Sequence, residues 1–119
     1  MPTFRKIKIG KKTINAEVAD SYLKRALGLM FRAKGRMLFE FALPLNYGIW
    51  MAFMIIPIDI IFIGRNNKIM KIVENAQPMT LNPKTWKIFF SGNGCRYVLE
   101  TESGFAKKNK VRIGQKLQI

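Results

Sequence analysis

The chain has 119 residues, of which 49% are hydrophobic and 24% are charged. This balance excludes a wholly disordered chain, and the length predicts a single domain spanning residues 1–119. The unusual total is the charge, because 21 Lys and Arg against 7 Asp and Glu give a formal net charge of +14. That charge attracts polyanions, so nucleic-acid binding is one hypothesis, and a charged surface that keeps copies apart is the alternative.

Three short features of the sequence indicate the cellular compartment and whether the chain spans a membrane. A single Cys95 excludes an intramolecular disulfide framework, which favours a cytoplasmic protein. The opening residues, MPTFRKIKIGKK, lack the apolar core of a secretory leader. Segment 49–63 is the most apolar, but it is shorter than the ~20 residues that a spanning helix needs and contains Pro57 and Asp59. We therefore expect no membrane span.

The first half of the chain reads as strands separated by turns, with one helix. Alternating or apolar runs predict strands at 4–9, 13–19, 36–41, 47–53 and 58–64. A narrow apolar stripe at helical spacing predicts a short helix over 21–28. Both faces of the strand at 58–63 are apolar, so we expect this strand to be covered on both sides. Pro57 cannot donate to a β-ladder and suits the position where that strand begins.

The second half continues the same pattern. A turn at 65–68 leads to strands at 68–74, 86–90, 95–102 and 111–119, with a long loop at 76–84 and a short helix at 104–110 capped by Ser103. Many short strands and few helices predict a mainly β (α+β) fold: a compact antiparallel sandwich or barrel-like domain with one or two short helices.

Six motifs in register resemble one known family. They are EVAD (17–20), GLMFR (28–32), GRMLFEF (35–41), WM (50–51), PIDIIFI (57–63) and RYVLE (96–100). Together with Gly104 and Gly114 they resemble domain-of-unknown-function family 192, also called uncharacterised protein family 0127. The resemblance implies a small β-rich sandwich or barrel with a helix packed on it, and no established activity.

The chain departs from that family at two places. After WM the family usually has a polar stretch similar to KNT, whereas Ala52, Phe53 and Met54 follow here. Before MLF it usually has Gly, whereas this chain has Arg36 with Gly35 one place earlier. The first departure puts in doubt any function that the polar stretch supplies.

Missing residue types exclude several chemistries. Without His, the chain has neither a Ser-His-Asp or Cys-His arrangement nor a His-based zinc site. One Cys makes no thiolate cluster, and Cys95 beside Arg96 reads as a small apolar filler rather than a nucleophile. No phosphate-cradling Gly-rich loop is present. We therefore predict no cofactor and no metal site.

Asp59 is the main candidate, because a carboxylate in an apolar strand must find donors or become protonated. Arg32 and Arg36 are the expected partners, since each could offer a bidentate guanidinium. One interpretation makes Asp59 a structural pin that fixes a loop or the helix connection. The other places it with Arg32 in a ligand pocket walled by Trp50 and Met51.

Glu100 is predicted on a mixed polar face of its strand, cross-paired with a neighbouring cation. Asp59 and Glu100 could in principle divide acid and base work, which leaves a carboxylate-based enzyme as one open alternative. Lys84 and Lys87 flank Trp86, a pattern that fits nucleic-acid stacking as well as an edge strand protected from aggregation.

The leading hypothesis is a non-enzymatic binding domain. A cleft near Arg32, Trp50, Met51 and Asp59, with Glu100 and Arg36 nearby, would take a small molecule or an extended peptide. Weak electrostatic binding of nucleic acid is the second hypothesis. The sequence leaves open whether any reaction is catalysed.

Overall fold

The computed structural model describes residues 3–19 and 34–119, so the helix expected at 21–28 and Arg32 lie outside the described residues. Within these described residues, eight strands form two sheets. They are β1 (Phe4–Ile9), β2 (Lys12–Ala19), β3 (Met37–Leu45), β4 (Gly48–Trp50), β5 (Ile58–Ile63), β6 (Ile69–Ala76), β7 (Ile88–Phe90) and β8 (Cys95–Glu102). The short helices are η1 (Arg65–Asn67), η2 (Pro83–Thr85) and α2 (Phe105–Lys108). The fold is mainly β, a sandwich-like α+β domain, as predicted.

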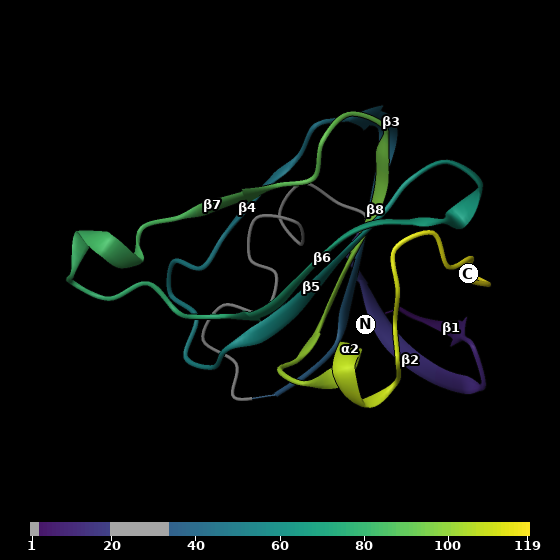
Figure 1. The fold of residues 1–119 in the computed structure, drawn as a ribbon, viewed down its shortest axis with the longest axis horizontal. Helices are drawn as coiled ribbons and strands as arrows, with labels where there is room; N and C mark the ends of the chain where they lie inside the picture. Colours follow the sequence, from purple (N-terminus) through teal and green to yellow (C-terminus); the bar gives the residue numbers. More distant parts are fainter. Residues whose placement is uncertain (1–2, 20–33) are drawn as a thin grey trace.

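The larger sheet has six strands in the order β1-β2-β3-β8-β5-β6 (Figure 1). All pairs are antiparallel except β2 and β3, which run parallel. The sheet is therefore mixed rather than purely antiparallel. The smaller sheet pairs β4 with β7.

All six residues of β5 are buried, as the two apolar faces of that segment predicted. The faces contribute to different cores. The first core gathers Ile7, Ile9, Ile14, Ala16, Leu38, Ile61, Ile63, Ile69, Leu99, Phe105, Ala106, Val111 and Leu117. The second gathers Ala19, Met37, Phe39, Met51, Met54, Ile58, Ile60, Phe62, Ala76, Cys95 and Val98. The six-stranded sheet thus separates two apolar layers.

Residues 111–119 do not form the strand that their sequence predicted, and together with Lys110 they make up the C-terminal segment, residues 110–119. Lys110 and Gly114 have positive φ angles of 53° and 89°, which break an extended strand. The segment instead makes isolated bridges, Lys8 to Gln118 and Lys68 to Lys116. It therefore hydrogen-bonds to β1 at one side of the sheet and to the start of β6 at the other, and it covers the first core.

The strand expected over 47–53 is also shorter, since β4 ends at Trp50. Phe53 takes a positive φ of 61°, and the Met54 N–H donates to the Met51 carbonyl at 3.3 Å. The chain turns here because that geometry is incompatible with an extended ladder. The turn at 65–68 is confirmed, with Asn66 and Asn67 both at positive φ.

Candidate functional site

Asp59 is sealed inside the protein, with 0% of its surface exposed. Its Oδ1 accepts the Asn75 backbone N–H at 2.8 Å, and its Oδ2 accepts the Ala106 backbone N–H at 2.9 Å. Both carboxyl oxygens therefore face amide donors from two other segments of the chain. These are the contacts of a structural pin that ties β5 to β6 and to the start of α2.

The local backbone explains why both donors need this carboxylate. Opposite Asp59, β6 carries an additional residue, because Ile58 pairs with Ala76 and Ile60 pairs with Val73. Such a bulge leaves a backbone N–H outside the regular ladder. The first N–H groups of a helix lack intrahelical partners, and in α2 the cap residue supplies no side-chain hydrogen bond to them. Asp59 satisfies one donor of each kind.

Ser103 does not cap α2, contrary to the prediction. The residue at the cap position is Gly104. Its φ of 92° lies in the left-handed region, which favours Gly because Gly has no Cβ. The Ser103 hydroxyl instead donates to the Asn75 side-chain oxygen at 2.7 Å. Asp59 of β5 thus accepts the hydrogen bond from the start of α2 that the sequence predicted for Ser103.

Arg36 pairs with Glu102 rather than with Asp59. Its Nε and one terminal nitrogen donate to the two carboxylate oxygens at 2.9 and 2.8 Å, the bidentate arrangement that favours Arg. The hydrogen bond from Arg36 lowers the pKa of Glu102, and the same bond raises the pKa of Arg36. Arg36 lies close enough to the surface to pair there, whereas Asp59 is already occupied by backbone donors.

Trp50 and Met51 lie on the other side of the sheet from Asp59. Met51 is 1% exposed and belongs to the second core, while Asp59 binds Ala106 of the first core. Trp50 is 54% exposed at the end of β4. Within the described residues, the sheet therefore keeps Asp59 apart from Trp50 and Met51, and these three line no common cleft.

Glu100 is buried, whereas the sequence predicted it on a mixed polar face, paired with a neighbouring cation. Strand β8 lies between β3 and β5, so Glu100 sits between Met37 and Ile60 and is 4% exposed. No group among the described residues donates a hydrogen bond to its carboxyl. Burial raises the pKa of Glu100 to about 8, because transfer out of water disfavours the charged form.

Asp59 and Glu100 face opposite sides of the sheet. Asp59 is opposite Thr101, and Ile60 is opposite Glu100, so the two carboxyl groups alternate across the pleat. Asp59 points to α2, whereas the neighbours of Glu100 belong to the second core. The pair therefore cannot act as acid and base on one substrate.

Cys95 and the acidic residues offer no metal or nucleophile site in the described part of the chain. Cys95 is fully buried, and its thiol donates to the Tyr97 carbonyl at 3.3 Å. Burial raises the pKa of the thiol, which disfavours the nucleophilic thiolate. Within the same described ranges, no three His, Cys, Asp or Glu side chains gather as metal ligands.

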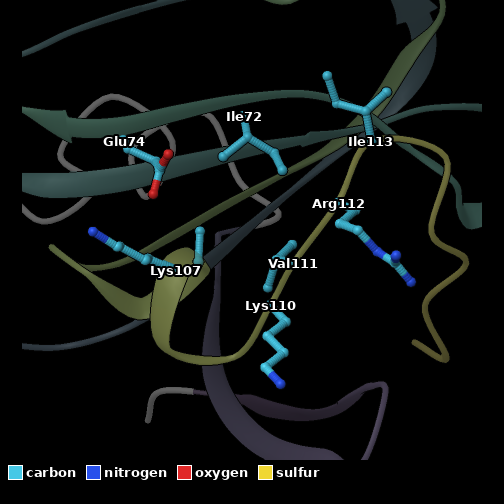
Figure 2. A pocket seen from close by; sticks show the side chains of 8 residues that line it. Ile72, Glu74, Lys107, Lys110, Val111, Arg112 and Ile113 are labelled. Carbon is cyan, nitrogen blue, oxygen red and sulfur yellow. The ribbon is translucent and has the colours of Figure 1, made fainter.

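A groove lies elsewhere, between β6, α2 and the C-terminal segment. Its volume is about 940 Å³, and its lining residues are Ile72, Glu74, Ala106, Lys107, Lys110, Val111, Arg112 and Ile113. Figure 2 shows Ile72 and Val111 projecting toward one another from the two sides. In the same view, Lys110 and Arg112 extend away from these two side chains. The groove thus combines an apolar floor with cations around it.

The C-terminal segment hydrogen-bonds to the start of β6. Gly114 N donates to the Ile69 carbonyl at 2.8 Å, and Ile69 N donates to the Gln115 carbonyl at 2.9 Å. Beyond Ile69, β6 is the outer strand of the sheet in the described part of the chain. An edge strand presents backbone N–H and C=O groups that can pair with another extended chain.

Sequence reasoning missed this groove. The available signal was the run KKNKVRI at 107–113, which mixes four cations with two β-branched apolar residues. The sequence predicts the end of a helix and the start of a strand over this run. These residues line a groove because the tertiary structure places the C-terminal segment beside β6.

The fold and the described residues define a small, mainly β domain with two apolar layers and a cation-lined groove. The DUF192 family model, described as "Uncharacterized ACR", matches residues 5–119. The chain therefore belongs to the DUF192 family. Within the described ranges, no helix is long and apolar enough to cross a membrane.

Relatives and solved structures agree with that membership. The chain is 36% identical over 105 residues to the UPF0127 protein PH1112 of Pyrococcus horikoshii, covering 85% of this chain and 84% of that protein. It is similar to the crystal structure of a protein of unknown function from Novosphingobium aromaticivorans, with a TM-score of 0.88, 25% identity and coverage of 100% and 93%. A second crystal structure, from Sinorhizobium meliloti, is provisionally described as a transcription regulator and aligns with a TM-score of 0.85 at 28% identity, covering 98% of this chain and 94% of that one.

Proposed function

We propose that this chain is a non-enzymatic binding domain that holds an extended acidic peptide in the groove beside β6. The observation that carries the proposal is the combination of an outer strand with an adjoining groove that has an apolar floor and cations around it. An extended peptide adds a strand to such an edge through backbone hydrogen bonds, and its alternate side chains enter the neighbouring groove.

The charges around the groove select an acidic partner. Lys107, Lys110 and Arg112 line the groove with Glu74 as the single acidic residue. A peptide with alternating Glu and Val would place its apolar side chains near Ile72 and Val111 and its carboxylates near the cations. The net charge of +14 would also speed the encounter with such a peptide.

Binding of a fluorescein-labelled decapeptide of alternating Glu and Val tests this proposal. We expect saturable binding, measured by fluorescence anisotropy, that weakens at least about tenfold in a Lys110→Glu, Arg112→Glu double variant. The control is Lys6→Glu, Lys8→Glu, which makes the same change of net charge on exposed residues of β1. We expect the control to change the affinity less than about twofold.

Backbone pairing has its own test. N-methylation of alternate amides in the same peptide removes the donors that strand addition requires, and we expect it to abolish binding. Equal loss of affinity in the two double variants, or undiminished binding of the N-methylated peptide, would contradict the proposal.

Nucleic-acid binding is a second candidate, favoured by cations on the outer face of the β1–β2 hairpin. Lys6 and Lys8 are exposed and alternate with buried Ile7 and Ile9. A salt titration against random RNA and DNA tests it. A dedicated role requires saturable binding that survives ~150 mM salt with a steep salt dependence, whereas weak attraction vanishes there. Here the Lys6→Glu, Lys8→Glu variant should lose binding, and the Lys110→Glu, Arg112→Glu variant becomes the control.

A further inference from the structure

A second surface, independent of the groove, is formed by the arm, which we define as residues 47–56 and 77–90. The arm contains β4, β7 and the loops beside them, and Figure 1 shows it extending away from the six-stranded sheet to a tip at η2. It has no Asp or Glu and only two cations, Lys84 and Lys87, in a chain that is 24% charged. The arm is therefore sparsely charged in a strongly basic protein.

Exposed apolar side chains concentrate on this arm. Seven of the eleven large hydrophobic residues exposed in the described part of the chain belong to it: Trp50, Phe53, Ile55, Leu81, Trp86, Ile88 and Phe90. Leu81, in the loop just before η2, is 97% exposed. Scattered apolar residues are normal on a surface, but a gathering of this kind marks an interaction site.

The arm holds these side chains outward by its own hydrogen bonds. The Trp86 indole N–H donates to the Thr80 carbonyl at 2.8 Å, and Thr80 N donates to the Thr85 hydroxyl at 2.8 Å. These bonds close the tip on either side of Leu81. The exposure of Leu81 and Trp86 therefore belongs to an ordered turn and not to a loose chain end.

On the ribbon itself, neighbouring side chains form one apolar face. Trp50 pairs with Ile88 and Gly48 pairs with Phe90, so these positions share a side of the two-stranded sheet. A side chain at Gly48 would come within 2.9 Å of both Ile88 and Phe90. The absent Cβ lets these two side chains lie across the ribbon as a continuous surface.

The amino-acid composition of this surface favours a lipid surface over nucleic acid or a second copy of the chain as its binding partner. Nucleic acid needs closely spaced cations and aromatic faces, but the arm has two Lys, and Ile55, Leu81 and Ile88 have no π-system to stack on a base. A second copy of the chain would bring another +14 charge. A lipid surface accepts aliphatic side chains among its acyl chains and Trp at the level of its headgroups.

We infer that the arm docks on an anionic lipid surface, with Leu81 and Trp86 inserted at the headgroup boundary and the basic body held against the anionic lipids. The charge and the apolar tip act together, because long-range attraction brings the protein to the membrane and apolar burial retains it. This is attachment to one leaflet and needs no membrane-spanning segment.

The intrinsic fluorescence reports on the arm directly, because both tryptophans of the chain, Trp50 and Trp86, lie in it. We expect vesicles of phosphatidylcholine with one third phosphatidylglycerol to shift the emission to the blue and to co-sediment the protein. Vesicles of phosphatidylcholine alone should bind at least about tenfold less protein.

A matched pair of variants tests the role of the tip. Leu81→Asp should weaken vesicle binding at least about tenfold, since it puts a charge where an apolar side chain inserts. Ile113→Asp makes the same exchange at a residue that is 68% exposed outside the arm, and it should change vesicle binding less than about twofold. Leu81→Asp should leave binding of the acidic decapeptide unchanged, which separates this inference from the proposed function.

Three binding results would overturn the inference. They are equal weakening by Leu81→Asp and Ile113→Asp, co-sedimentation without a change in tryptophan emission, and a tryptophan response to single-stranded oligonucleotides with none to vesicles. A dimer in sedimentation velocity that Leu81→Asp dissociates would likewise assign the arm to a second copy of the chain.

Discussion

Glu100→Gln is expected to remove most of the dependence of stability on pH between pH 5.5 and 7.5. The pKa of Glu100 is raised from 4.5 to about 8 by burial, so the native protein keeps a proton that the unfolded chain releases. The stabilisation is complete below pH 4.5 and is lost as the pH rises through about 8. The slope is about 1.4 kcal/mol per pH unit, so the wild type should lose ~2–3 kcal/mol relative to the variant across this window.

Urea unfolding of both proteins at pH 5.5, 6.5 and 7.5 measures this difference. At pH 5.5 the wild type should already be about 1–2 kcal/mol less stable than the variant, because the unfolded Glu is ionised there while the neutral Glu and the Gln have nearly the same shape in the native protein. Glu102→Gln is the matched control on the same strand. The pKa of Glu102 is lowered by its hydrogen bond to Arg36, so its linked stability is present above the ordinary value of 4.5 and is lost only at lower pH. A Glu100→Gln protein that keeps the wild-type slope would contradict the assignment.

Replacement of Asp59 is expected to give the largest loss of stability from a single change. Asp59→Ala leaves the Asn75 and Ala106 N–H groups without their acceptor in a fully buried place, and we expect a loss of about 3–5 kcal/mol. Asp59→Asn keeps one acceptor oxygen but turns its amide donor toward the other N–H, and should cost about 2–4 kcal/mol.

Two further measurements separate a pin from a generally sensitive core position. Hydrogen exchange in Asp59→Asn should show faster exchange at Asn75 or Ala106 than at other amides of β6 and α2. Thr101→Val, at the paired position on β8, removes one hydroxyl hydrogen bond to a backbone carbonyl and should cost only about 1 kcal/mol. A loss below about 1 kcal/mol for Asp59→Ala would refute the role of Asp59 as the link between β5, β6 and α2.

Much of the strand pattern could be predicted, because the period of apolar residues is a local property. The buried run from Ile58 to Ile63 and the turn at Asn66 and Asn67 are examples. The parallel pairing of β2 with β3 was missed, since no residue within either strand encodes the direction of its neighbour. The C-terminal segment was misassigned because its alternation is real, but Lys110 and Gly114 turn the backbone out of a strand.

The candidate site divides in the same way. From the sequence alone it followed that Asp59 lies in an apolar strand and must find fixed donors. The identity of those donors was decided by the tertiary structure, which brings together amides 16 and 47 residues away along the chain. The burial of Glu100, the opposite facing of the two carboxyl groups, the groove beside β6 and the projecting arm are likewise tertiary. Each depends on which strands and segments lie next to one another, and residue spacing within a single strand carries no information about that.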